Sequence, residues 1–288
     1  PSDSISFPEF PEIAIEAGLD HISLAGGSIV EDFNQDGFYD IIASSWGVDN
    51  QIQYFKNSGD GRFVNLTKNA NLMDITGGLN IVHGDYNNDG LADLFILRGG
   101  WFGEDGQHPN SLLKNNGDDS FTDVTIAANI YSERPTQTAS WGDFNNDGWI
   151  DIFVGNESAE GTYYPSELFR NNGDGTFTEI AQSVGLNIIG FVKGAVWGDI
   201  NNDGLLDLYV SRLGEPNLLF ENSGPEKNWL FKEIASQAGV TEPLNSFPVW
   251  FWDYNNDGWE DIWVSGYEAS SGDVAMDYLG LKHSGESP

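Results

Sequence analysis

Short apolar runs of three or four residues recur along the chain, separated by turns that are rich in Asn, Asp and Gly. The runs are too short for helices and are rich in β-branched and aromatic residues, so they predict strands. Four runs follow one another in each of the first four repeats: one ends at an acidic loop, the next starts directly after it, and the last two flank a turn rich in Asn, Gly and Asp that suits a tight hairpin. The fifth repeat has the first two runs but lacks this turn and the last run. Each repeat is therefore predicted to be a four-stranded antiparallel meander.

The acidic loop has the pattern Asp-x-Asn-x-Asp-Gly-x-x-Asp and occurs five times. We number the copies loop 1 to loop 5, and they occupy residues 32–40, 85–93, 143–151, 199–207 and 253–261. Consecutive loops start 53, 58, 56 and 54 residues apart. Four strands in a repeat of that length predict an all-β fold, a β-propeller whose blades stack radially and so hide their strand edges.

One propeller domain is expected over residues 1–288. Its repeats are expected at approximately 21–78, 79–137, 138–191, 192–245 and 246–288. Residues 7–20 resemble the fourth strand at 177–186, so they are expected to close or to precede a blade. Either they complete the fifth repeat and close a five-bladed ring, or the five repeats belong to a larger ring. The second interpretation is favoured, because the sequence stops before the fifth repeat would normally end.

Each loop supplies the oxygen ligands that calcium prefers, since this ion takes six to eight oxygens, mostly from carboxylates and carbonyls. Side chains at loop positions one, three, five and nine offer such oxygens, and position seven offers its backbone carbonyl. The Gly at position six permits a sharp turn around the ion. Up to five calcium ions are predicted, held by Asp32, Asn34, Asp36, Phe38, Asp40, Asp85, Asn87, Asp89, Leu91, Asp93, Asp143, Asn145, Asp147, Trp149, Asp151, Asp199, Asn201, Asp203, Leu205, Asp207, Asp253, Asn255, Asp257, Trp259 and Asp261.

A single copy of this loop would be a modest indication, because Asn-Asp-Gly is ordinary turn chemistry. Five copies that keep every Asp, the Asn and the Gly are much stronger, since three carboxylates within nine residues repel one another without a cation. Magnesium requires a tighter octahedral shell and fits less well. An EF-hand does not fit, because its last acid is a Glu at position twelve between helices, whereas here the last acid is an Asp at position nine between strands.

The charge and the composition of the chain limit the classes of molecule that it can bind. The chain has 12 Lys and Arg against 45 Asp and Glu, a net charge of −33, which repels nucleic acid and anionic membrane surfaces. Five calcium ions would leave −33 + 10 = −23. No apolar run is long enough to insert in a membrane, and the absence of Cys excludes disulfides and thiolate sites. A secreted, extracellular or cell-surface location is expected, where abundant calcium fills weak sites.

The blocks around the loops resemble a known family. Residues 141–148 read Trp-Gly-Asp-Phe-Asn-Asn-Asp-Gly, and residues 168–180 read Leu-Phe-Arg-Asn-Asn-Gly-Asp-Gly-Thr-Phe-Thr-Glu-Ile. With the five loops, they resemble the FG-GAP/VCBS repeat family, which includes the integrin α-chain head, and most of all its secreted members of the cartilage-acidic-protein (ASPIC/UnbV-associated) type. The resemblance implies a propeller of commonly seven blades, a secreted or surface location, and a role in adhesion or binding. The literal Phe-Gly and Gly-Ala-Pro signatures are missing, so no ligand-binding residue carries over from the integrins.

The loops between the second and third strands are long and aromatic, and they point to the end opposite the calcium loops. They form the candidate ligand surface, because loops on a rigid scaffold commonly carry function and exposed aromatics suit sugar rings or protein anchors. The alternative, given equal weight, is that these side chains pack on their own loops. The candidate ligand-binding residues are Trp46, Arg98, Trp101, Phe102, His108, Tyr163 and Tyr164.

No catalytic motif is recognisable, and no catalytic residue is assigned. The expected function is an extracellular, calcium-stabilised propeller that binds a glycan or protein ligand without catalysis, as in cell adhesion. Two alternatives stay open. One is a calcium-dependent polysaccharide lyase or hydrolase, for which Arg98, His108 and Tyr163 are the available groups. The other is a structural subunit of an extracellular assembly or filament, which would involve self-association.

Overall fold

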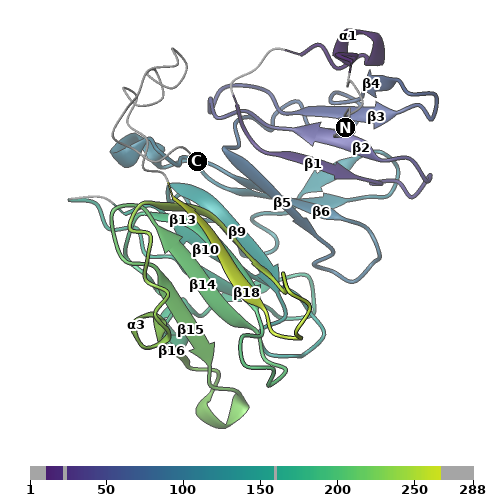
Figure 1. Ribbon diagram of the computed structural model, residues 1–288. Coiled ribbons are helices and arrows are strands. Elements are labelled where there is room, and N and C mark those ends of the chain that lie inside the picture. The colour runs from purple at the N-terminus through teal and green to yellow at the C-terminus, as the bar shows by residue number, and fades with distance from the viewer. Residues whose placement is uncertain (1–10, 22–24, 159–160, 267–288) are drawn as a thin grey trace, which may run out of the picture.

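The computed structural model describes residues 11–21, 25–158 and 161–266, and these form five antiparallel sheets, one for each repeat (Figure 1). In the first four sheets the strands are ordered as in the sequence. The strands of these sheets are β1 (Ser28–Glu31), β2 (Asp40–Ala43), β3 (Gln53–Asn57) and β4 (Phe63–Asn65); β5 (Asn80–Gly84), β6 (Asp93–Leu97), β7 (Ser111–Asn115) and β8 (Phe121–Asp123); β9 (Thr136–Gly142), β10 (Asp151–Asn156), β11 (Glu167–Asn171) and β12 (Phe177–Glu179); and β13 (Val192–Gly198), β14 (Asp207–Arg212), β15 (Leu218–Asn222) and β16 (Phe231–Glu233). In the fifth sheet, the described residues form β17 (Ser246–Trp252) and β18 (Asp261–Gly266).

Each acidic loop joins the first strand of its sheet to the second. Glu31 pairs with Asp40, so loop 1 leaves β1 and returns to the sheet at its own ninth residue. Gly142 pairs with Asp151 in the same way at loop 3. The ninth residue of the loop is therefore the first residue of a strand, whereas the residues before it lie at the end of the sheet. The predicted four-stranded meander is confirmed for the first four repeats.

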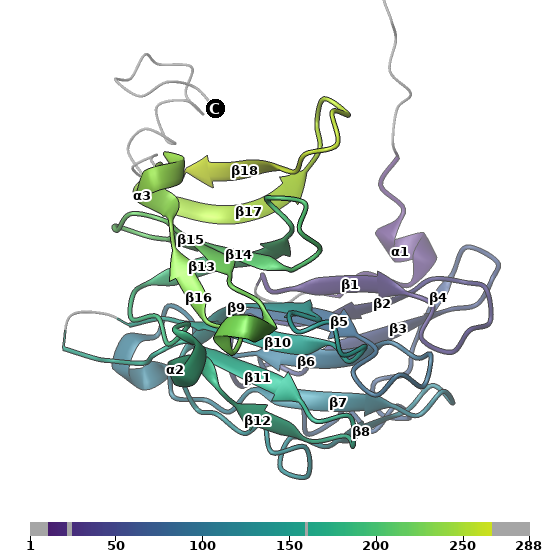
Figure 2. The same ribbon diagram turned by 90° about the horizontal axis from the view of Figure 1, so that it is seen from below.

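Neighbouring sheets pack in sequence order with their first strands side by side: β1 contacts β5, β5 contacts β9, β9 contacts β13, and β13 contacts β17. Figure 2 shows the sheets arranged one after another in this order. Apolar clusters fill the space between them, and the cluster shared by the first two sheets includes the fully buried Ile42 and Leu94. The central strands β6 and β10 are buried along their whole length, because each inner sheet is covered on both faces.

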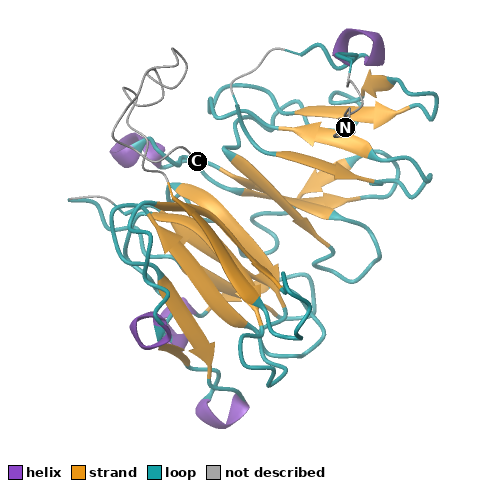
Figure 3. Ribbon diagram, viewed as in Figure 1, coloured by secondary structure: helices purple, strands orange, loops and turns teal. Residues whose placement is uncertain are grey.

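Short helical turns follow the fourth strand, as in α2 (Ala181–Val184) and α3 (Ala235–Ala238) (Figure 3). The Ala181 N–H donates to the Glu179 carboxylate at 2.8 Å, and the turn ends at Gly185 with a left-handed φ of 84°. Helix α1 (Ala14–Ala17) ends in the same way at Gly18. The expectation of a strand through 7–20 is therefore wrong for Ala14–Ala17, and residues 7–10 lie outside the described part of the chain.

Two 3-10 turns complete the structure, Gly103–Gly106 in the long loop after β6 and Pro225–Lys227 after β15. No helix in the described ranges is long and apolar enough to cross a membrane.

Candidate metal centre

The acidic side chains of each loop fold back onto its own backbone. In loop 3 the Asp147 N–H donates to Asp143 Oδ1 at 3.0 Å and to Asn145 Oδ1 at 3.1 Å. The Gly148 N–H donates to Asp143 Oδ2 at 2.8 Å, and the Trp149 N–H donates to Asp147 Oδ1 at 3.0 Å. The same four bonds are present in all five loops. They turn the first, third and fifth side chains inward, and each carboxylate oxygen keeps a second lone pair for another partner.

The ninth residue is fully buried in loops 1 to 4 and half-buried in loop 5, where it is Asp261. Asp151 is 0% exposed and accepts N–H groups from Asn171 at 2.8 Å and from Phe144 at 3.3 Å. Burial raises its pKa to about 8, and the charges of Asp147 and Asp143 add to the effect.

The carboxylate at position nine also has a raised pKa in loops 2 and 4. Burial raises the pKa of Asp93 to about 7 and that of Asp207 to about 6, and in each case the other aspartates of the loop contribute. A divalent cation would relieve both causes, because it neutralises the repulsion and solvates the buried charge.

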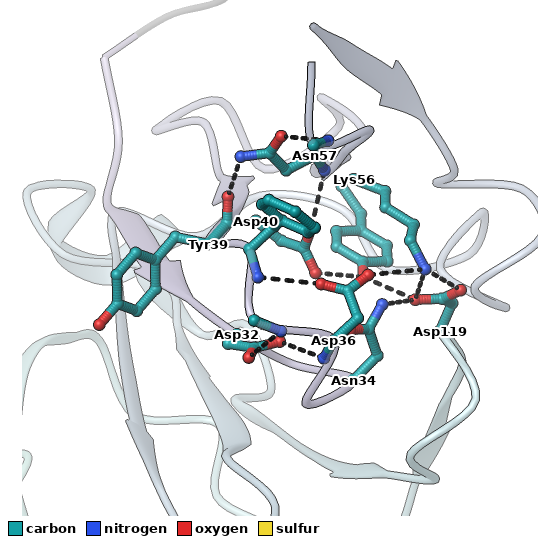
Figure 4. A network of polar contacts seen from close by, with 12 residues as sticks. Asp32, Asn34, Asp36, Tyr39, Asp40, Lys56, Asn57 and Asp119 are labelled. Atoms are coloured by element: carbon teal, nitrogen blue, oxygen red, sulfur yellow. Dashed lines mark hydrogen bonds and ion pairs between the residues drawn. The ribbon is translucent and has the colours of Figure 1, made fainter. Parts of the chain in front are cut away.

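In loop 1 a lysine ammonium lies beside the acidic side chains (Figure 4), although burial also raises the pKa of its ninth residue, Asp40. The Lys56 ammonium lies 3.5 Å from Asp36 and 2.7 Å from Asp119, which reaches in from the second repeat. Asp119 also accepts the Asn34 amide at 2.5 Å. The buried Asp40 accepts the Tyr54 hydroxyl at 2.9 Å, a partner that no other ninth Asp has among the described residues.

The third strand of each of the first four sheets ends in an Asn, and the residue before that Asn differs between repeats. In loop 2 the Lys114 ammonium lies 3.3 Å from Asp89. This pair corresponds to Lys56 and Asp36 in loop 1, which lie 3.5 Å apart. The corresponding residues in the third and fourth repeats are Arg170 and Glu221, and within the described residues neither forms an ion pair with its loop. The loop motif is constant, but the charge that faces it is not.

The donor set of the loops fits a hard divalent cation, because it consists of carboxylates, an amide oxygen and a backbone carbonyl. The two lysines are stand-in cations that show where positive charge is attracted. In residues 11–21, 25–158 and 161–266, no three His, Cys, Asp or Glu side chains are gathered in ligating positions, so the fit rests on the donor set and on these stand-ins. Coordination at each predicted ligand stays a prediction.

The aromatic residues of the long loops pack partly against one another. The Trp46 ring stacks on Phe102 at 4.9 Å, and the Trp46 Nε1–H donates to the Gly100 carbonyl at 3.3 Å. Phe102 in turn contacts the His108 ring edge-on at 6.4 Å. Three of the seven candidate ligand residues thus form one small cluster, in which Trp46 keeps 37% of its surface exposed.

Arg98, Tyr163 and Tyr164 lie in three different settings. The buried Arg98 guanidinium donates to the carbonyls of Thr76 and Pro109, both at 2.6 Å, so its donors are used inside the protein. The Tyr164 hydroxyl accepts the Gln107 amide at 2.7 Å, while Tyr163 is 73% exposed.

Trp101 lies over a buried charge that the sequence did not indicate. The Lys193 ammonium, which is 0% exposed, lies 3.3 Å from the centre of the Trp101 ring and 3.8 Å from that of Phe191. It forms an ion pair with the buried Glu157, whose other carboxylate oxygen accepts the backbone N–H of Trp101 at 2.6 Å. Lys193 lies between apolar residues of a first strand, and that position is the one signal that could have marked it.

Comparison with known protein families finds a match to three overlapping segments of the chain. The pattern described as FG-GAP-like repeat matches residues 32–96, 85–154 and 143–210, which together cover more than half of the chain. The chain belongs to the FG-GAP-like repeat family. The resemblance drawn from the loops is therefore confirmed.

This FG-GAP repeat chain is 28% identical over 228 residues to cartilage acidic protein 1 of Homo sapiens and, with the same identity and length, to that of Mus musculus. The matches cover 76% of this chain but only 33% and 34% of the relatives, so the chain spans about a third of their length. Among solved structures it is similar to the V. cholerae biofilm matrix protein Bap1, with a TM-score of 0.49 and 15% identity over 84% of this chain and 35% of that one.

Proposed function

We propose that the protein is a calcium-stabilised β-propeller that acts outside the cell as a non-catalytic binding or adhesion module. The observation that carries the proposal is the loop geometry, in which five loops repeat the same four hydrogen bonds around their acidic side chains. In the middle three, a buried ninth Asp has a raised pKa. The ordered contacts between successive first strands support a propeller as the arrangement of the sheets.

In each loop, the side chains at positions one, three, five and nine and the carbonyl at position seven would hold the ion. Bound calcium supplies positive charge at the turn between the first and second strands. The residues of the chain then do the rest: the backbone N–H groups orient the carboxylates, and the buried ninth Asp ties the loop to its sheet. The proposed role of the ion is to stiffen this turn rather than to contact a ligand.

The end opposite the calcium loops is the proposed ligand surface. Trp46, Trp101 and Tyr163 are 37%, 41% and 73% exposed there, and aromatic faces of this kind suit sugar rings or protein anchors. A polysaccharide lyase is less well supported, because Arg98 uses its donors on backbone carbonyls. The family relationship with cartilage acidic protein 1 supports an extracellular location.

The proposal is tested by calorimetric calcium titration together with a glycan and matrix-protein binding array, with and without a chelator. We expect several calcium ions per chain and ligand binding that W46A reduces, with F63A, far from this end, as a control for folding. Absence of calcium binding would refute the metal assignment. Release of unsaturated sugars from an anionic polysaccharide would replace the binding role with lyase activity.

A further inference from the structure

Each acidic loop is joined to the next by the side chain at its fourth position. That side chain donates an amide N–H to the carbonyl of the glycine at the sixth position of the following loop. The four contacts, which we call the loop latches, are Gln35 to Gly90 at 2.7 Å, Asn88 to Gly148 at 2.9 Å, Asn146 to Gly204 at 2.8 Å, and Asn202 to Gly258 at 3.0 Å. The latches run in one direction along the whole series of loops.

The donor of each latch lies between two predicted calcium ligands. Asn146, for example, separates Asn145 from Asp147 and has a left-handed φ of 53°. The fourth residue of every loop has a similar φ, between 53° and 59°. Asn adopts this conformation more readily than most residues, and here it directs the amide towards the next loop. Ordering of the ligands on either side therefore also orders the latch.

The acceptor of each latch is bonded directly to a predicted ligand of the next loop. The Gly204 carbonyl belongs to the same peptide group as the Leu205 N–H, which donates to Asp203 Oδ1 at 2.9 Å. A peptide group is rigid and planar, so a bond at one end fixes the orientation of the other. Hydrogen bonds in series also polarise one another. Asn146 in loop 3 thus helps to position Asp203, the predicted ligand at position five of loop 4.

A second contact runs in the opposite direction. The Asn222 backbone N–H donates to Asp207, the predicted ligand at position nine of loop 4, at 2.7 Å. The side-chain amide of Asn222 donates to the Phe144 carbonyl of loop 3 at 2.9 Å. Asn171 links loops 3 and 2, and Asn115 links loops 2 and 1, in the same way. Loops 1 and 2, loops 2 and 3, and loops 3 and 4 are therefore each joined by two hydrogen-bond paths, whereas loops 4 and 5 are joined by the latch among the described residues.

We propose that the loop latches couple neighbouring calcium sites, so that an ion in one loop favours binding in the next. The proposal rests on the proposed calcium binding. Filling one site orders its latch, and the adjoining loop then has less conformational freedom to lose when it binds. By reciprocity the effect operates in both directions along the series. One hydrogen bond corresponds to a change in neighbouring affinity of about three- to tenfold.

A double-mutant cycle on loops 3 and 4 tests the coupling. D147N weakens the site in loop 3, and N146G removes the latch while keeping the left-handed backbone, which Gly adopts freely. The readout is the calcium concentration that half-protects the amides of residues 199–207 from hydrogen exchange. In the wild-type background D147N is expected to raise this concentration about three- to tenfold, and in the N146G background the rise is expected to be clearly smaller, because only the Asn222 path then joins loops 3 and 4.

N256G is the matched control, because within the described residues the Asn256 amide donates to no other loop. In that background the effect of D147N on loop 4 is expected to persist. Equal effects of D147N with and without the latch, or no effect in either, would overturn the coupling while leaving calcium binding intact. If calcium protects no loop of the wild-type protein, both the coupling and the proposed function fall.

Discussion

The two ends of the sheets treat buried charge in opposite ways. At the long-loop end, Lys193 is paired with Glu157 under an aromatic ring, and Arg98 is surrounded by backbone carbonyls. At the calcium-loop end, Asp151 is equally buried but its nearest charged neighbours are other aspartates. The chain supplies the counter-charges of the long-loop end, whereas the buried Asp151 has no chain cation paired with it, and we expect its counter-charge to come from solution. The stability of the second end should therefore depend on dissolved ions, and that of the first should not.

Loop 1 lies between these extremes. It has the same nine-residue motif as loop 3, but Lys56 and the Tyr54 hydroxyl give its carboxylates partners from the chain (Figure 4). The motif therefore does not define the electrostatics of the site alone. The strand-three residue beside each loop determines how much of the charge is left for an external cation.

Removal of calcium by a chelator should have the largest effect on stability, and this effect should arise at the calcium-loop end. A site filled at 100 times its dissociation constant contributes about 2.7 kcal/mol, so two such sites correspond to a fall in Tm of roughly 10–20 °C when calcium is removed. Thermal unfolding with EDTA, and then with excess calcium or magnesium, measures this shift. An unchanged Tm in EDTA would contradict the comparison of the two ends.

K193M should destabilise the long-loop end by about 3–5 kcal/mol, because it leaves the Glu157 carboxylate buried without a counter-charge. Urea unfolding measures the loss, which should be the same with and without calcium. The double variant K193M/E157Q removes both charges and should recover most of the stability. A calcium-dependent loss, or no recovery in the double variant, would show that the ends are not independent.

D147N and D36N change the same position in loops 3 and 1 and should differ in sign when calcium is absent. D147N removes a like charge beside Asp151 and should be neutral or stabilising. D36N removes one of the two carboxylate partners of Lys56 and should cost up to about 1 kcal/mol. With calcium present, D147N should instead lose about 2–3 kcal/mol of ion-dependent stability. Equal behaviour of the two variants in urea unfolding would argue against a special loop 1.

The buried lysine should also give the long-loop end its own pH dependence. Burial lowers the pKa of Lys193 to about 8, from an unfolded value of about 10.5. Between these values the unfolded chain binds more protons, so stability should rise with pH through this window. Relative to K193M/E157Q, the wild type should gain on the order of 1–2 kcal/mol from pH 8 to pH 9.5. A flat difference would mean that Lys193 titrates normally.

The smallest expected effect is that of K56M on loop 1. Removal of the half-buried ammonium beside Asp36 should raise the calcium affinity of loop 1 about two- to threefold, as expected for an ion pair of about 0.5 kcal/mol. Calcium-dependent hydrogen exchange of residues 32–40 measures it. K68M is the control, because it changes the net charge equally and Lys68 forms no ion pair among the described residues. A similar rise in K68M would indicate a general charge effect only.

Much of the fold followed from short-range patterns. Strand length and the Asn-Gly turns predicted the strands and hairpins, because these features act within about ten residues. The spacing of the loops, 53 to 58 residues, then gave the length of each four-stranded unit. The helical turns were missed, although the Ala-to-Gly stretch at 181–185 has the composition of a short helix with a Gly end.

The relations between repeats could not be obtained in this way. The contact of Lys193 with Trp101, and that of Lys56 with Asp119, depend on how one sheet is rotated against another. The latch residues Asn88, Asn146 and Asn202 recur in the sequence, but an Asn at a left-handed turn position has a sufficient local explanation. Only the structure shows that their amides reach the next repeat.

The latches also bear on how such an array arises. Both halves of the contact, the amide donor and the glycine carbonyl, are encoded in the same nine residues. Tandem duplication of one gene segment would therefore copy a complete joint, and the new unit would fit between its neighbours without compensating mutations elsewhere. A unit exchanged with a related repeat would retain its joints only if both its fourth and its sixth loop residues were kept. In recombination experiments, crossovers placed between the loops should accordingly give more folded chimeras than crossovers placed inside them.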